Sequence, residues 1–226
     1  MPAPADRRAA APATSPVPGD GGDPHLSALP VARARMGWLL LVGGAVGLLA
    51  SFVLSVERYR LALDPTGYTP SCSLNPVISC GTVMAQEQAA ILGFPNPFLG
   101  VAAFPVPVTL GAVLLSGTAL PRWVWRGLQL GVTAAAVLVA WFVTQAYYAI
   151  HALCPYCMVV WAVVVPMFWV LTADNLDRGR IPVPAALHPL VRALVDYRLL
   201  VVLLSYALLA ALAGVEFWAY WRTLLP

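Results

Sequence analysis

Charge is the feature that this sequence has least of. Only 10% of its 226 residues are charged, whereas a soluble domain carries roughly 25%. With 60% hydrophobic residues and a mean hydropathy of +0.78, the chain is not an ordinary soluble domain and has the composition of a membrane protein. The net charge of +3 is too small to indicate a nucleic-acid partner. Lysine is absent, and we attribute the exclusive use of arginine to codon bias rather than to chemistry.

The polar residues leave five apolar stretches that are long enough to cross a membrane. About 20 helical residues span roughly 30 Å of hydrocarbon, and a backbone in hydrocarbon must satisfy its own hydrogen bonds. The predicted fold class is therefore an all-α integral membrane protein, with a four-helix transmembrane bundle and a fifth transmembrane helix. The predicted spans are 36–56, 98–120, 128–150, 154–173 and 199–220.

The remaining segments set the predicted domain boundaries. Residues 1–33 are rich in Pro and Ala, show no apolar period and are predicted to form a disordered tail. Residues 34–173 form the predicted catalytic core, with a long loop over 57–97. A second loop over 174–198 leads to the fifth helix at 199–222.

The placement of arginines predicts which side of the membrane the N-terminus and each loop face. An N-terminus in the cytoplasm puts ten arginines on the cytoplasmic side and three on the other side. The predicted location is the cell inner (plasma) membrane, with all four cysteines facing the periplasm or exterior. Disulfides persist in that oxidising compartment, and cysteines on one face can meet.

The cysteines form two pairs in the sequence. The helix pair, Cys154 and Cys157 in "CPYC", opens the fourth span. Pro155 suits the first position of a helix, so we expect Cys154 to be its N-cap. A helix N-terminus favours a thiolate, and this effect is large in C-x-x-C pairs. The motif therefore indicates a redox-active pair, and an inert disulfide or two buried thiols is the alternative.

The loop pair, Cys72 and Cys80, lies in "CSLNPVISCG". Asn75 before a proline predicts the N-cap of a short amphipathic helix lying on the membrane surface. A stabilising loop disulfide without turnover is one interpretation of this pair. Four cysteines could also bind zinc, but only one pair has the short spacing and an oxidising compartment disfavours free thiolates, so no metal site is predicted.

The two pairs together, with "GFPNP" at 93–97 between them, resemble the bacterial vitamin K epoxide reductase (VKOR) family over roughly 36–173. The order of the pairs supports this resemblance, because the functionally analogous DsbB family has its C-x-x-C pair first. In some bacterial members the fifth helix leads into a fused thioredoxin-like domain. No such domain follows it here, so we expect the stand-alone form.

The resemblance implies an electron relay around a bound quinone, either menaquinone or ubiquinone. A separate periplasmic thioredoxin-like protein, similar to DsbA, reduces the loop pair. Cys80 then attacks Cys154, and Cys157 passes the electrons to the quinone. Membrane lipid surrounds the bundle.

At two positions this chain has residue types that differ from those common in the family. The family often has a serine where this chain has Gln86 and a tyrosine where it has Trp161, although an indole N–H can still donate a hydrogen bond. Asn96 is the main candidate for a quinone contact, and a turn-forming role is the alternative. His151 is a candidate proton shuttle or an exposed loop residue, and Glu216 is a candidate interfacial anchor.

The predicted activity is that of a membrane thiol oxidase and quinone reductase that supports disulfide bond formation. Two alternatives stay open. The same thiols could reduce vitamin K epoxide or a quinone as the main substrate. The chain could instead be a transporter or scaffold whose disulfides are structural.

Overall fold

The computed structural model describes residues 24–223, and the regular structure of this part is almost entirely helical. The α-helices are α1 (Pro24–Leu63), α2 (Cys80–Met84), α3 (Pro97–Ala103), α4 (Pro105–Leu115), α5 (Arg122–Gln145), α6 (Pro155–Asp177), α7 (His188–Asp196), α8 (Arg198–Glu216) and α9 (Trp218–Trp221). Shorter turns are the 3₁₀ segments η1 (Glu87–Ala90) and η3 (Ala185–Leu187), and the π-helical segment η2 (Ala146–Ile150).

Five helical segments of the described part are long and apolar enough to cross a membrane. They are Val31–Leu63, Pro97–Leu115, Arg122–Ile150, Pro155–Asp177 and Arg198–Glu216. The predicted all-α membrane fold with five spans is therefore confirmed. Of the predicted tail, residues 1–23 lie outside the described residues, whereas residues 24–33 already belong to α1. The predicted loops over 57–97 and 174–198 contain α2 and α7.

The second predicted span is two helices rather than one. A proline lacks an N–H and its ring clashes with the preceding turn. Pro105 therefore ends α3 at Ala103 and starts α4, with Phe104 as the junction. The same span ends at Leu115, five residues before the predicted end.

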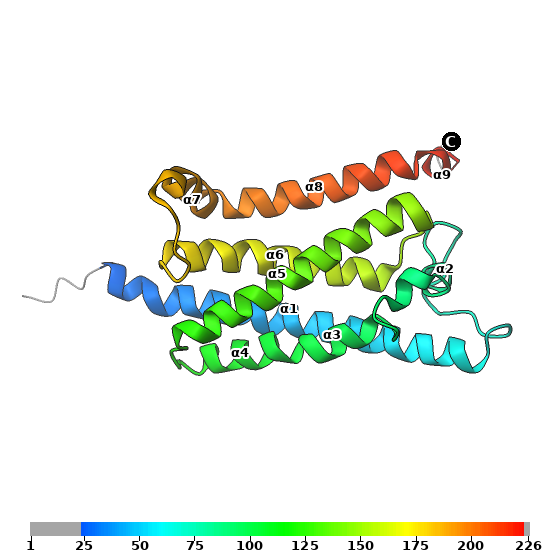
Figure 1. The fold of residues 1–226 in the computed structure, drawn as a ribbon, viewed down its shortest axis with the longest axis horizontal. Helices are drawn as coiled ribbons and strands as arrows, with labels where there is room; N and C mark the ends of the chain where they lie inside the picture. Colours follow the sequence, from blue (N-terminus) through cyan, green and yellow to red (C-terminus); the bar gives the residue numbers. More distant parts are fainter. Residues whose placement is uncertain (1–23, 224–226) are drawn as a thin grey trace, which may run out of the picture.

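Helix α1 lies at the centre of the bundle and packs against α3, α4 and α6 (Figure 1). Small residues allow the close approach, as is common between membrane helices. A Cβ on Gly47 would overlap the ring of Phe104. A Cβ on Gly111 would lie 2.5 Å from the backbone nitrogen of Leu41. Larger residues at these two positions would push α1 away from α3 and α4.

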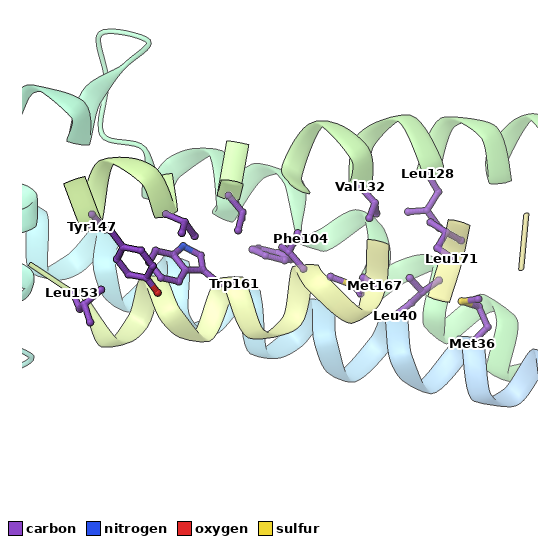
Figure 2. Packing of buried hydrophobic residues seen from close by; sticks show 14 of the residues in the cluster. Met36, Leu40, Phe104, Leu128, Val132, Tyr147, Leu153, Trp161, Met167 and Leu171 are labelled. Atoms are coloured by element: carbon purple, nitrogen blue, oxygen red, sulfur yellow. The ribbon is translucent and has the colours of Figure 1, made fainter. Parts of the chain in front are cut away.

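The hydrophobic core runs along the interface between α1, α5 and α6 (Figure 2). Met36 and Leu40 of α1 lie near Met167 and Leu171 of α6 at one end, and Trp161 packs against Tyr147 towards the other. Helix α8 packs on α6 outside the four-helix core, and most of its residues are not buried within the protein.

Candidate active site at the cysteine pairs

The loop pair forms a disulfide between Cys72 and Cys80, whose Cα atoms lie 5.5 Å apart. Both residues are buried, with 6% of Cys72 and 0% of Cys80 exposed. They lie beside Leu54 of α1 and Met84 of α2, so the disulfide rests on the end of α1.

The segment between the two cysteines folds differently from the sequence-based prediction. Asn75 does not cap a helix; its Oδ1 accepts hydrogen bonds from the backbone N–H groups of Val77 and Ile78, at 3.0 and 2.7 Å. The helix starts five residues later, at Cys80, and its N-cap is Ser79, whose Oγ accepts from the N–H of Thr82. The asparagine was misassigned because Asn stabilises a tight turn and a helix start through the same kind of bond.

The helix pair has the predicted local structure. Cys154 is the N-cap of α6, Pro155 is the first helical residue, and the Cys154 Sγ accepts from the N–H of Cys157 at 3.5 Å. A side-chain hydrogen bond from Cys157 and the backbone N–H groups of Cys157 and Tyr156 lower the pKa of Cys154, although burial opposes this shift. The lowered pKa favours the thiolate form of Cys154, which lies just outside the membrane-spanning segment that α6 forms.

Backbone bonds join the two pairs. The N–H of Leu153 donates to the carbonyl of Val77 at 2.7 Å, and the N–H of Ser79 donates to the carbonyl of Leu153 at 2.9 Å. These bonds form a single parallel β-bridge between Ile78 and Leu153. Ile78 lies just before Cys80 in the sequence, and Leu153 lies directly before Cys154. The bridge therefore sets the distance between the two cysteines. Their Sγ atoms lie 3.3 Å apart.

An apolar cavity of about 600 Å³ begins at the helix pair and extends between α3–α4 and α5. Cys154 and Cys157 form one end, and Met167 lies towards the far end. The wall on α5 includes two glycines, Gly127 and Gly131, and a Cβ on either would meet nothing within 4 Å. Other lining residues include Leu54, Ala103, Phe104, Pro107, Ala135, Leu138, Val139, Phe142, Val160 and Val164.

The three predicted quinone-contact residues, Cys157, Trp161 and Asn96, all line the cavity. Trp161 is 5% exposed, lines the cavity and packs its ring against Tyr147. Asn96 also lines the cavity, but its Nδ2 donates to the carbonyl of Gln88 at 2.6 Å and its Oδ1 accepts from the N–H of Ile91. These bonds favour the turn-forming role. Gln86, which stands where the family often has a serine, is exposed, and its side-chain amide donates to the carbonyl of Thr82.

Glu57 is a functional candidate that the sequence-based prediction missed. This carboxylate of α1 is 5% exposed and accepts hydrogen bonds from the Tyr68 and Ser71 hydroxyl groups and from the Ser71 N–H. Ser71 is the neighbour of Cys72, so Glu57 fixes the entry to the loop pair. The available signal was an acidic residue near the end of an apolar span, which is expensive unless it is paired.

Helix α8 supports the same region from outside. His151 Nε2 lies 3.4 Å from Glu216 Oε1, and His151 has a positive φ of 54° in the turn before the helix pair. The Tyr147 hydroxyl donates to the carbonyl of Leu209, and the Tyr147 ring packs against Phe217. His151 and Glu216, considered separately in the sequence, are therefore partners.

Comparison with known families agrees with this geometry. A model of the vitamin K epoxide reductase family matches residues 38–172, which include α1 from its membrane part, both cysteine pairs and nearly all of α6. The comparison with curated proteins finds no matching relative. Members of this family are oxidoreductases of the membrane, and the match covers more than half of the chain. The chain belongs to the vitamin K epoxide reductase family.

Proposed function

We propose that this chain is a thiol:quinone oxidoreductase that reoxidises a DsbA-like periplasmic protein and so supports disulfide bond formation. The observation that carries the proposal is the 3.3 Å contact between Cys80 Sγ and Cys154 Sγ at the end of an apolar cavity. A structural disulfide would not require a second, unpaired pair of thiols at contact distance. The arrangement suits a relay, in which the disulfide of one pair oxidises the dithiol of the other.

The exchange conserves electrons and protons at every step. A dithiol of the partner reduces the Cys72–Cys80 disulfide and leaves as a disulfide. The Cys80 thiolate then attacks Cys154 of an oxidised helix pair, so that the Cys80–Cys154 bond forms and Cys157 leaves as a thiolate. Cys72 attacks Cys80, which restores the loop disulfide and reduces Cys154. In the structure Cys72 and Cys80 are bonded and Cys154 and Cys157 are free. This pairing corresponds to the stage after the loop disulfide has been restored and before the helix pair is reoxidised.

The cavity fits a quinone by size and chemistry. A cavity of about 600 Å³ lies in the usual range for a small-molecule site, and its walls are apolar apart from the thiols and a few polar side chains. A bound quinone accepts the two electrons and two protons that the helix pair releases when it returns to a disulfide. Trp161 and Cys157 lie at the reactive end, where an indole N–H can donate a hydrogen bond. Asn96 holds the neighbouring loop in place.

The partner is expected to reach the loop pair from the periplasm. Cys72 is the attacked sulfur because Cys80 faces Cys154 and is completely buried. Cys72 itself is 6% exposed, so the segment around Ser71 must move before a partner thiol can reach it.

Two double variants test the sulfur geometry. In Cys72→Ala/Cys157→Ala the remaining thiols are Cys80 and Cys154, and mild oxidation should link them nearly completely. In the matched control, Cys80→Ala/Cys157→Ala, the remaining Cys72 and Cys154 should stay largely unlinked. Mass spectrometry of the non-reduced peptides measures both yields. Equal yields in the two variants would show that the Cys80–Cys154 contact does not direct the exchange.

A turnover assay then tests the activity. Reoxidation of a reduced DsbA-like protein by quinone should require Cys154 and Cys157 individually. If either single alanine variant kept full activity, the relay would be excluded and the disulfides would be structural.

A further inference from the structure

The end of the bundle opposite the cysteines contains a small recess with a basic lining. It has a volume of about 120 Å³ and is bounded by the start of α1, the end of α4 with the link after it, Trp125 of α5, and the end of α6 with the following turn. Arg33, Arg178 and Arg180 line it, and Asp174 is the one carboxylate among its lining residues. Arginines that lie far apart in the sequence thus meet at one small opening.

Backbone carbonyls hold Arg33, which lines the recess, and two neighbouring arginines that do not line it. Arg33 Nη1 donates to the carbonyl of Gly117 at 2.7 Å, and Arg122 Nη2 donates to the carbonyl of Gly179 at 2.7 Å. Arg126 Nε donates to the carbonyl of Arg180 at 2.9 Å. A guanidinium group has five N–H donors, so Arg33 keeps further donors for a ligand in the recess.

Three arginines and a single carboxylate are the charged residues among those that line the recess. Arg178 and Arg180 share the carboxylate of Asp174, at 2.8 and 2.6 Å. Arg180 is only 13% exposed and lies 4.0 Å from the ring centre of Trp125. Burial lowers the pKa of Arg180, Asp174 opposes this shift, and the positive charges of Arg178 and Arg122 lower the pKa further. An anion in the recess would relieve this repulsion.

We propose that this recess binds a phosphate group, either in the headgroup of an anionic phospholipid or as free phosphate. Guanidinium groups bind phosphate oxygens through paired hydrogen bonds. The membrane-spanning segments that border the recess begin at Val31 and end at Asp177, next to Arg33 and Arg178. These side chains therefore lie at the depth of the lipid headgroups, where basic pockets between helices bind anionic lipids. A bound headgroup would link α1, the α4–α5 connection and α6.

Native mass spectrometry in a neutral detergent tests the site. The protein is titrated with phosphatidylglycerol, with phosphatidylcholine and with inorganic phosphate in separate arms. The test variant is Arg33→Gln/Arg178→Gln, and the matched control is Arg60→Gln/Arg222→Gln, which removes the same charge from the cysteine end. We expect one tightly bound phosphatidylglycerol in the wild type and the control, and about tenfold or weaker affinity in the test variant.

Each outcome decides the proposal. Binding of phosphatidylglycerol or of inorganic phosphate that is lost only in the test variant supports the site and identifies the source of the phosphate. The proposal would be overturned if the test variant bound phosphatidylglycerol and inorganic phosphate as well as the wild type does. It would also be overturned if the test variant and the control variant lost binding to the same extent. If the test variant fails to fold, a photoactivatable phosphatidylglycerol is cross-linked to the wild type. Labelling within 31–36 or 174–180 supports the site, and labelling confined to other segments contradicts it.

Discussion

At the scale of single residues, a buried carboxylate positions the loop pair. Glu57 accepts three hydrogen bonds from Tyr68 and Ser71, and Ser71 directly precedes Cys72. Hydrogen bonds to a charged group contribute about 1.5–3 kcal/mol each, and their loss leaves buried donors unpaired. Glu57 does not touch the reacting sulfurs, so it acts by holding the segment that carries Cys72.

We predict that Glu57→Ala makes the loop disulfide easier to reduce. Release of Tyr68 and Ser71 should expose Cys72 and increase the rate of reduction by a small dithiol, and the free energy of unfolding should fall by about 1–3 kcal/mol. Glu87→Ala is the control, because Glu87 is exposed in the same region. Thiol labelling after timed reduction measures the rates. Identical rates for the two variants would refute the positioning role.

A second residue-scale prediction concerns the acidity of Cys154. The side-chain hydrogen bond from Cys157 is the largest cause of its lowered pKa. With Cys72 and Cys80 changed to alanine, Cys157→Ala should raise the pKa of Cys154, and Cys157→Ser should raise it less because a hydroxyl group can still donate. The ultraviolet absorbance of the thiolate as a function of pH measures both values. The expected midpoint is at lower pH in the serine variant, and coinciding midpoints would contradict the cause assigned here.

At the scale of elements, the cavity depends on small residues in α5. Gly131 lines the cavity, and a Cβ added there would meet nothing within 4 Å, so we expect room for a larger side chain at this position. The four-helix arrangement itself was predictable from five apolar stretches. The gap between α3–α4 and α5 was not, because it depends on which faces of the helices carry glycine and how the helices are turned.

Gly131→Phe should therefore block the cavity and leave the fold intact. Quinone-dependent turnover is expected to fall by roughly tenfold or more, which corresponds to about 1.4 kcal/mol of lost affinity. Cross-linking of Cys80 to Cys154 should not change, because those sulfurs lie at the end of the cavity. Gly214→Phe on α8 is the control, since a Cβ there also meets nothing and the residue does not line the cavity. Turnover equal to that of the control would argue against quinone entry by this route.

At the scale of the whole molecule, the bundle has two ends, one that includes α7 and one that includes α2 and α9 (Figure 1), and they differ in their number of arginines. Arginines 33, 35, 122, 126, 178, 180, 192 and 198 belong to the end that includes α7, and arginines 58, 60 and 222 belong to the cysteine end. Basic residues near short loops favour the cytoplasmic side. The structure puts both cysteine pairs at the same end, as the predicted orientation requires.

Reporter fusions test that orientation. A cytoplasmic fluorescent reporter should be active after Thr118, which follows the second span, and alkaline phosphatase should be active after Thr223, which follows the fifth. Exchange of the two reporters should abolish both signals. The reverse pattern would place the cysteines in the cytoplasm, where a stable loop disulfide is not expected.

The sequence by itself determined the membrane class, the five spans, the capping of α6 by Cys154 and the family, because each depends on local composition or on a short motif. The tertiary structure decided how the pairs meet. Cys80 and Cys154 are 74 residues apart in the sequence, and their 3.3 Å contact depends on the bridge between Ile78 and Leu153, which no local pattern encodes. The roles of Glu57 and Asn96 were hidden for the same reason. A polar side chain takes its function from the donors and acceptors that folding brings to it, and the sequence shows only that the side chain is present.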